Sequence, residues 1–209
     1  MNKVNTYLTH LTRLGFIFWL VFETLNWLGV LHFTLDFTWR GLIMTSAVVW
    51  GMVEIVSALT KRWTGKPLPW FVFFGALFST SVDAIGDIQH WYVEFDWYDK
   101  MAHALGGGMA ALLVFFVIWQ LVHAGKIFLG KKLAGFMSFS VAAFLGVCYE
   151  LEEYIEDVIT HGNRLGDGPD TANDLMWNTI GAVAAVVVLV ALVTQVREWR
   201  IARNDMAKK

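Results

Sequence analysis

Six long apolar runs constrain this chain more than any other feature of its sequence. A helix needs about 20 residues to cross the roughly 30 Å hydrocarbon core of a bilayer. Inside hydrocarbon the backbone must satisfy its own hydrogen bonds, which a helix does within one segment. The sequence therefore predicts an all-α, polytopic membrane protein, a bundle of six transmembrane helices at about residues 14–33, 41–60, 69–91, 100–123, 133–157 and 174–196.

The composition agrees with a membrane location. Hydrophobic residues make up 56% of the chain and charged residues only 16%, against about 25% charged in a typical soluble domain. At 209 residues, we expect one integral membrane domain covering residues 1–209. The single cysteine, Cys148, allows neither an intrachain disulfide nor a zinc-thiolate cluster. The expected partners are membrane lipid and a lipid-linked substrate; no nucleic acid is expected, and the sequence leaves the oligomeric state open.

The basic residues are sorted strongly along the chain. Of the 16 Lys and Arg, only Arg40, Lys100 and Arg164 fall on the outer side if the N-terminus is cytoplasmic. The other 13 then lie on cytoplasmic segments, as the positive-inside rule requires. We therefore expect a multi-pass protein of the inner (cytoplasmic) membrane with both termini in the cytoplasm. The acidic segments 83–103 and 150–174 then lie at the outer leaflet.

Acids and histidines gather at the outer ends of the expected helices. Ionisable groups in lipid are costly unless they pair, line water or bind a ligand. Many carboxylates at one depth repel one another unless protons or cations lie among them. The pattern therefore indicates a metal or proton site formed from Asp83, Asp87, His90, Asp99, His103, Glu150, Glu153, Asp157, Asp170 and Asp174.

Two motifs carry most of this signal. Asp99 and His103 are four residues apart, so they share a helix face and can chelate one cation or form a proton relay. Glu150 and Glu153 close an apolar run, and two carboxylates at that spacing suit a hard divalent metal. The structural alternatives are that Asp99 only caps its helix and that the glutamates mark a solvated helix end.

Further polar residues extend the pattern. Asp170, Asp174 and Asn178 form one stripe, and Asp83, Asp87 and His90 form another. Helix capping is the structural alternative for Asp170 and Asp174, but Asn178 lies deeper and needs a partner. For the second stripe, helix-end solvation is an equal alternative. The deeper residues Glu23, Asn26 and Glu54 are either paired structural groups or a path inward. Four aromatic residues are expected to form an interface belt: Trp91, Tyr92, Trp97 and Tyr98.

The order of these motifs resembles that of the VanZ-like and YjdF-type families, two related groups of bacterial multi-pass membrane proteins. The shared pattern starts one helix with Asp-Lys-x-x-His, places Glu near the outer end of the next, and continues through an Asp-rich loop into Asp-x-x-x-Asn-x-x-Gly. VanZ-like proteins are associated with glycopeptide resistance, so the resemblance implies envelope or lipid chemistry. The residues that carry it are Asp99, Lys100, His103, Glu150, Glu153, Asp167, Asp170, Asp174, Asn178 and Gly181.

Taken together, the sequence favours a metal-dependent membrane enzyme that acts at the outer face on a phospholipid or polyprenyl phosphate. The divalent metal (Mg, Mn or Zn) is expected on His103, Glu150, Glu153, Asp170 and Asp174, joined by Asp87 and His90. The expected catalytic residues are Asp99, His103, Glu150, Glu153 and Asp174, and the expected substrate contacts are Lys100, Arg164 and Asn178. Two alternatives remain open: a cation or proton carrier or channel, and a non-catalytic structural or partner-docking factor.

Overall fold

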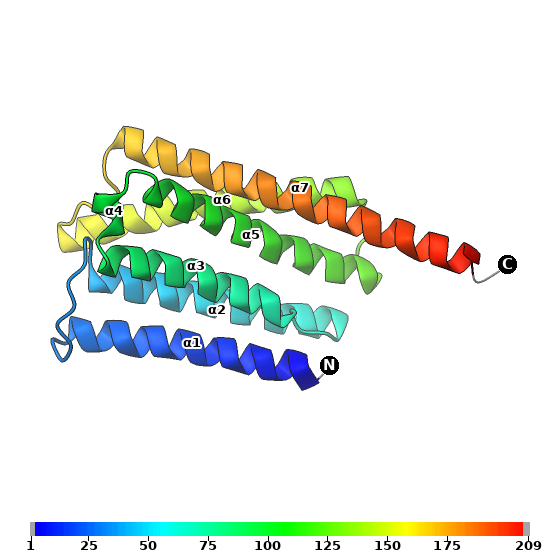
Figure 1. The fold of residues 1–209 in the computed structure, drawn as a ribbon, viewed down its shortest axis with the longest axis horizontal. Helices are drawn as coiled ribbons and strands as arrows, with labels where there is room; N and C mark the ends of the chain where they lie inside the picture. Colours follow the sequence, from blue (N-terminus) through cyan, green and yellow to red (C-terminus); the bar gives the residue numbers. More distant parts are fainter. Residues whose placement is uncertain (1–2, 207–209) are drawn as a thin grey trace.

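The computed structural model describes the backbone of residues 3–206 and the side chains of residues 3–194. The described residues form an all-helical bundle, which confirms the predicted fold class (Figure 1). Six helices are long and one, α4, is a single turn. Their bounds are α1 Lys3–Trp27, α2 Trp39–Thr64, α3 Trp70–Ile88, α4 Trp91–Glu94, α5 Tyr98–His123, α6 Lys131–Thr160 and α7 Gly168–Met206.

Five of these helices are long and apolar enough to cross a membrane: α2, α3, α5, α6 and the Gly168–Thr194 part of α7. Large apolar side chains cover their outer faces, for example Ile55, Phe136 and Val187, each more than half exposed. Such a surface is stable against acyl chains and would aggregate in water. The protein is therefore a polytopic membrane bundle.

The first predicted span needs correction. Helix α1 ends at Trp27, so residues 28–33 of the predicted span 14–33 are not helical. The chain reverses at Gly29, whose φ of 71° suits a residue without a Cβ. The side-chain oxygen of Asn26 then accepts a 3.1 Å hydrogen bond from the Phe33 backbone. Helix α1 is not among the five helices that are apolar enough to cross a membrane, so a sixth crossing stays a prediction.

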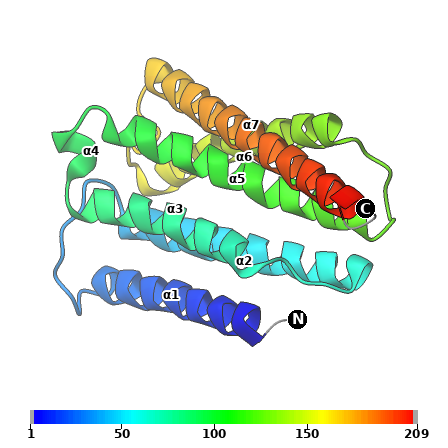
Figure 2. The ribbon, with the colours of Figure 1, turned by 45° about the vertical axis from the view of Figure 1, so that its right-hand side comes forward.

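The long helices form two neighbouring groups, α1–α3 and α5–α7 (Figures 1 and 2). Apolar side chains of α1, α2, α3 and α5, among them Phe16, Val53, Phe73 and Leu113, form the largest buried cluster. The start of α1 and the end of α7 lie at the same end of the bundle. Helix α4 and the connection between α6 and α7 lie at the opposite end. This arrangement brings the acidic helix ends together.

The deep polar residues have structural partners. Glu23 is fully buried and accepts a 2.9 Å hydrogen bond from Ser46. Glu54 forms a 2.5 Å ion pair with Arg13 and also accepts from Trp50. Both pairs join α1 to α2, which favours the structural interpretation of Glu23 and Glu54 over an inward path.

Glycines allow α5 and α7 to cross at backbone contact. A Cβ added at Gly107 would overlap the carbonyl oxygen of Asn178, and one added at Gly181 would overlap that of Ala104. Small residues at helix crossings permit this close approach in membranes. The crossing lies one turn below His103 and places α7 beside it.

Replacing Gly107 by alanine is therefore expected to lower the free energy of unfolding by about 1–3 kcal/mol, the usual cost of overpacking. The matched control is Gly51→Ala on α2, because nothing lies within 4 Å of an added Cβ there. Removing a helical glycine is otherwise worth about 0.5–1 kcal/mol, so the control should unfold at the wild-type temperature or above it. Thermal unfolding in detergent measures both variants, and equal midpoints for them would contradict the close crossing.

Candidate metal site

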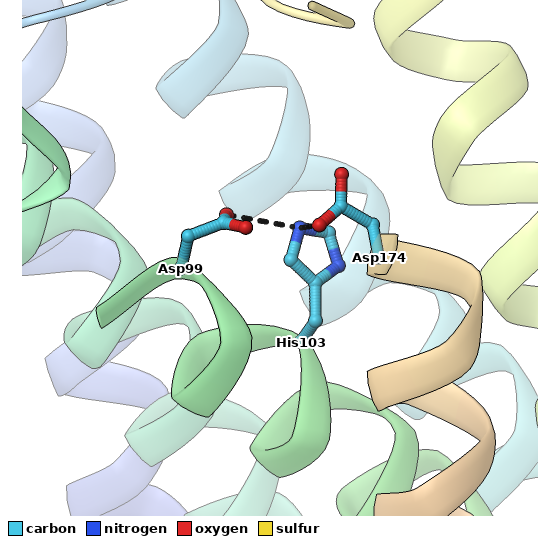
Figure 3. Close-up of side chains that lie close together, drawn as sticks. All are labelled: Asp99, His103 and Asp174. Carbon is cyan, nitrogen blue, oxygen red and sulfur yellow. Dashed lines mark ion pairs between the residues drawn. The ribbon is translucent and has the colours of Figure 1, made fainter. Parts of the chain in front are cut away.

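Asp99, His103 and Asp174 form a compact group at the acidic end of the bundle, which we call the triad. Asp99 and His103 lie on the first turns of α5, and Asp174 lies on α7 (Figure 3). The Nε2 atom of His103 lies 3.3 Å from Asp99 Oδ1 and 3.6 Å from Asp174 Oδ1. One potential ligand atom from each residue lies within 4.8 Å of the others. Both carboxylates thus converge on the same imidazole nitrogen.

The other side of the imidazole faces Asn178 and Glu150. The side-chain amide of Asn178 lies 3.1 Å from Nδ1, and Glu150 Oε1 lies 3.9 Å from it. The atom that points to Nδ1 is Nδ2 of Asn178, which donates, so a neutral imidazole carries its proton on Nε2, between the two carboxylates. Binding a metal at Nε2 would require the Asn178 amide to turn its oxygen to Nδ1, which would then carry the proton.

Several carboxylate oxygens here are buried without a hydrogen-bond partner. They include Asp174 Oδ1 and both oxygens of Glu150, and each residue is only 4% exposed. A buried carboxylate without a partner is costly, and the repulsion among these acids adds to that cost. A cation or shared protons among them would remove both penalties, so the arrangement fits a metal site.

The triad opens into a polar cavity of about 460 Å³. We call this cavity the acidic chamber. Its wall contains the predicted residues Lys100, Asp170 and Glu153 together with the triad. Glu150 lies beside His103 outside the chamber wall. The remaining lining residues include Phe37, Thr38, Leu42, Asp83, Asp87, Tyr92, Asp96, Tyr149, Asn163, Arg164, Gly166 and Asn173.

Arg164 fixes the loop between α6 and α7 to the bundle. It was expected to hold an anionic head group, but its guanidinium is buried and occupied by protein groups. Nε lies 3.1 Å from Glu153, Nη1 donates to Glu156 at 2.8 Å, and Nη2 donates to Tyr149 at 2.7 Å. Burial lowers the pKa of Arg164, but the surrounding Tyr149 and acid groups outweigh it and raise the pKa. The geometry therefore favours a permanent cation with a structural role.

Two further groups hold the same loop. Both oxygens of Asp157 accept backbone hydrogen bonds, from Arg164 at 2.8 Å and from Leu165 at 2.9 Å. Thr38, which caps α2, donates to Glu156. An added Cβ at Gly41 would press on both Glu156 and Arg164. The start of α2 thus completes this network, a contribution that the sequence motifs alone did not indicate.

The third-helix residues Asp87 and His90 lie apart from the triad. Asp87 is buried and accepts hydrogen bonds from the backbone of Asp36 and Phe37, at 2.7 and 2.9 Å. His90 lies beyond the end of α3, at φ 60°, and pairs with Asp36 at 2.6 Å. Asp87 lines the chamber. In the structure, however, the side chains of both residues bind the connection between α1 and α2. Their predicted role as ligands is not supported by this geometry.

Two tyrosines contribute to the chamber more than the sequence indicated. Tyr92, expected in an interface belt, donates a 2.7 Å hydrogen bond to Asp83 and lines the chamber. Burial and the nearby Asp83 raise the pKa of Tyr92 well above its ordinary value. Tyr149 packs edge-on against the His103 ring, with centroids 6.0 Å apart. The sequence feature that could have indicated this role is a tyrosine beside acidic residues at a helix end, because its hydroxyl can donate a hydrogen bond to a carboxylate.

Comparison with known proteins gives one relationship. Residues 13–195 match the model of a protein family described as "Predicted membrane protein (DUF2238)". Neither the curated proteins nor the solved structures contain a match to this chain.

Proposed function

The chain belongs to the DUF2238 family of predicted membrane proteins, and we propose that it is a divalent-metal-dependent enzyme whose metal site is the triad. One observation carries this proposal: three ligand atoms from Asp99, His103 and Asp174 lie within 4.8 Å of one another, next to buried carboxylate oxygens that lack a hydrogen-bond partner. A mixed set of one imidazole and carboxylates suits Mg²⁺, Mn²⁺ or Zn²⁺.

The chain's own residues have distinct roles in this proposal. Asp99, Asp174 and the Nε2 atom of His103 would hold the cation, and Asn178, with its side-chain oxygen turned to Nδ1, would fix the imidazole tautomer. Glu150, 3.9 Å from the imidazole, and Glu153, on the chamber wall, are the proposed proton acceptors. The bound metal would polarise a phosphoryl or ester oxygen and lower the pKa of a coordinated water.

The proposed substrate is an amphipathic envelope molecule, such as a phospholipid or polyprenyl phosphate. The motif resemblance to VanZ-like and YjdF-type proteins favours lipid chemistry, and the chamber lies at the end of a membrane bundle. Lys100, on the chamber wall, is the cation best placed to contact an anionic head group. Because Arg164 is saturated by protein groups, we assign it to loop structure instead.

We also propose that both termini are cytoplasmic and that the chamber faces the cell exterior. The start of α1 and the end of α7 lie at the same end of the bundle, opposite the connection between α6 and α7 (Figure 1). Asn163 and Arg164 of that connection line the chamber. The sorting of basic residues supports the same orientation. This topology requires α1 to be a sixth crossing.

The test is phosphate release from dioctanoyl phosphatidic acid and farnesyl phosphate by the purified protein in nanodiscs. We expect release with Mn²⁺ or Mg²⁺, loss with EDTA and recovery on adding metal. Asp174→Asn should lower the rate by about 100-fold or more, since losing a group that only supports a metal ligand already costs about 10–100-fold. The control is Glu94→Gln, an exposed acid on α4. Release that persists in EDTA would contradict the proposal.

A carrier for cations or protons is the second candidate. The residues below the triad, where a transport path would have to continue, disfavour it. Below the triad, a neighbouring cavity is lined mainly by apolar side chains. Glu23 and Glu54, which would continue a path, are held by Ser46 and Arg13. Rapid Mn²⁺ flux into proteoliposomes that Asp174→Asn removes would favour the carrier over the enzyme.

A further inference from the structure

A second cavity lies beneath the acidic chamber, between α2, α3, α5 and α6. Its volume is about 180 Å³ and its wall is mostly apolar, with Val53, Val72 and Leu113 among the lining residues. Leu113 is ten residues beyond His103 on α5, which corresponds to a depth of about 15 Å at 1.5 Å per residue. We call this space the apolar pocket.

The apolar pocket and the acidic chamber share part of their walls. Asp83, His103 and Tyr149 line both cavities. The imidazole of His103 therefore stands at the boundary, with the carboxylates of the triad on the chamber side. A molecule that spans this boundary would have a polar group at the triad and an apolar group directly below it.

Small residues create the apolar pocket. Gly106 and Ala110 of α5 face it, together with Ala76 of α3 and Ala142 and Gly146 of α6. Interiors are normally packed with few voids larger than a water molecule. Space kept open by small residues directly beneath a group of unpartnered carboxylates indicates a ligand site rather than loose packing.

We infer that the apolar pocket takes the first segment of a single hydrocarbon chain whose phosphate group lies at the triad. The inference rests on the proposed metal-dependent function and narrows its substrate to an amphiphile with a slender chain next to the phosphate. A dry cavity of about 150 Å³ binds benzene, so the pocket accommodates a segment of about six carbons and not two acyl chains side by side.

The test uses the full chain in detergent, loaded with Mn²⁺, and a series of n-alkyl phosphates from ethyl to decyl, each below its micelle concentration. Calorimetry or competition gives the affinity of each. Transfer of one methylene from water is worth about 0.8 kcal/mol, so affinity should rise about fourfold per carbon. The rise should end after about six carbons, where the pocket is full.

The plug variant is Gly106→Leu. An added Cβ at Gly106 meets nothing closer than 3.8 Å, the distance to Asn178 and Ser79, so a larger side chain enters without striking backbone. Ala76→Met fills the pocket from α3. The matched control is Gly51→Leu, where the surroundings of an added Cβ are open. Both plugs should abolish the chain-length dependence, lowering hexyl phosphate affinity at least tenfold while ethyl phosphate binding stays at the wild-type value.

Metal content, measured by elemental analysis on the same samples, separates the possible failures. If the plugs retain the metal and an unchanged chain-length series, the tail site is overturned and the metal site stands. If wild-type protein takes up no metal, the proposed function fails, and the inference that rests on it fails as well. If short phosphates weaken in Gly106→Leu along with metal loss, that plug has disturbed the triad, and Ala76→Met, compared with the control Gly51→Leu, decides.

Discussion

Replacing His103 by alanine is expected to remove the bound divalent cation. The variant deletes the only nitrogen ligand of the triad and leaves Asp99 and Asp174 without the group on which they converge, at 3.3 and 3.6 Å. Loss of a residue that merely supports a metal ligand costs about 10–100-fold in affinity, so loss of the ligand itself should exceed 100-fold. Elemental analysis after gentle purification, followed by Mn²⁺ titration, measures the effect.

The control is His123→Ala, at the other end of the same helix. The Nδ1 of His123 donates a 2.8 Å hydrogen bond to the Trp119 carbonyl, at the end of α5 opposite the triad. The His123→Ala variant should keep the wild-type metal content. Equal metal content in wild type, His103→Ala and Asp174→Asn would show that the bound metal is held elsewhere, and the triad would then be interpreted as a proton-sharing cluster.

Replacing Arg164 by methionine is expected to destabilise the fold by about 3–5 kcal/mol, the usual cost of breaking a buried ion pair. Methionine preserves much of the side-chain length but leaves Glu153 and Glu156 buried without their cation. At about 2–4 °C per kcal/mol for a chain of this size, the midpoint of thermal unfolding should fall by at least 6 °C.

A second substitution identifies the cause. Adding Glu156→Gln to Arg164→Met removes one uncompensated charge, so the double variant should recover part of the lost stability. The control is Arg40→Met, an exposed arginine that stacks on Trp27, where surface substitution should cost less than about 0.5 kcal/mol. If Arg164→Met unfolds at the wild-type temperature, the guanidinium is free in solution and its predicted role on a substrate head group returns.

The site was predictable in part from helix periodicity. Asp99 and His103 were paired from their spacing of four residues, which fixes a common helix face regardless of the partners around it. The meeting of Asp174 with this face depended on two helices far apart in sequence, and the glycine contacts at Gly107 and Gly181 make it possible. Spacing along one helix carries no information about which other helix packs against it.

For the third-helix residues Asp87 and His90, helix periodicity gave the wrong grouping. Asp87 and His90 have the same i, i+3 type of spacing as true neighbours on a helix, yet α3 ends at Ile88 and His90 turns away to Asp36. The competing partners, the backbone N–H groups of the loop before α2, are not visible in the pattern of the third helix. Tyr92 was likewise expected at the lipid interface. Its hydroxyl donates instead to Asp83, which lies on α3, and the sequence pattern around Tyr92 does not show this partner.

By itself the sequence determined the membrane class, the helical fold and the end of the bundle where the acids gather. These properties follow from local quantities: the length of apolar runs, the need for internal backbone hydrogen bonding and the distribution of charge. Only the tertiary structure decided that Asp174 joins Asp99 and His103, that Arg164 is saturated by glutamates, and that an apolar pocket adjoins the triad. Each of these depends on how closely separate helices approach, which is set by side-chain volume at contacts that no single segment contains.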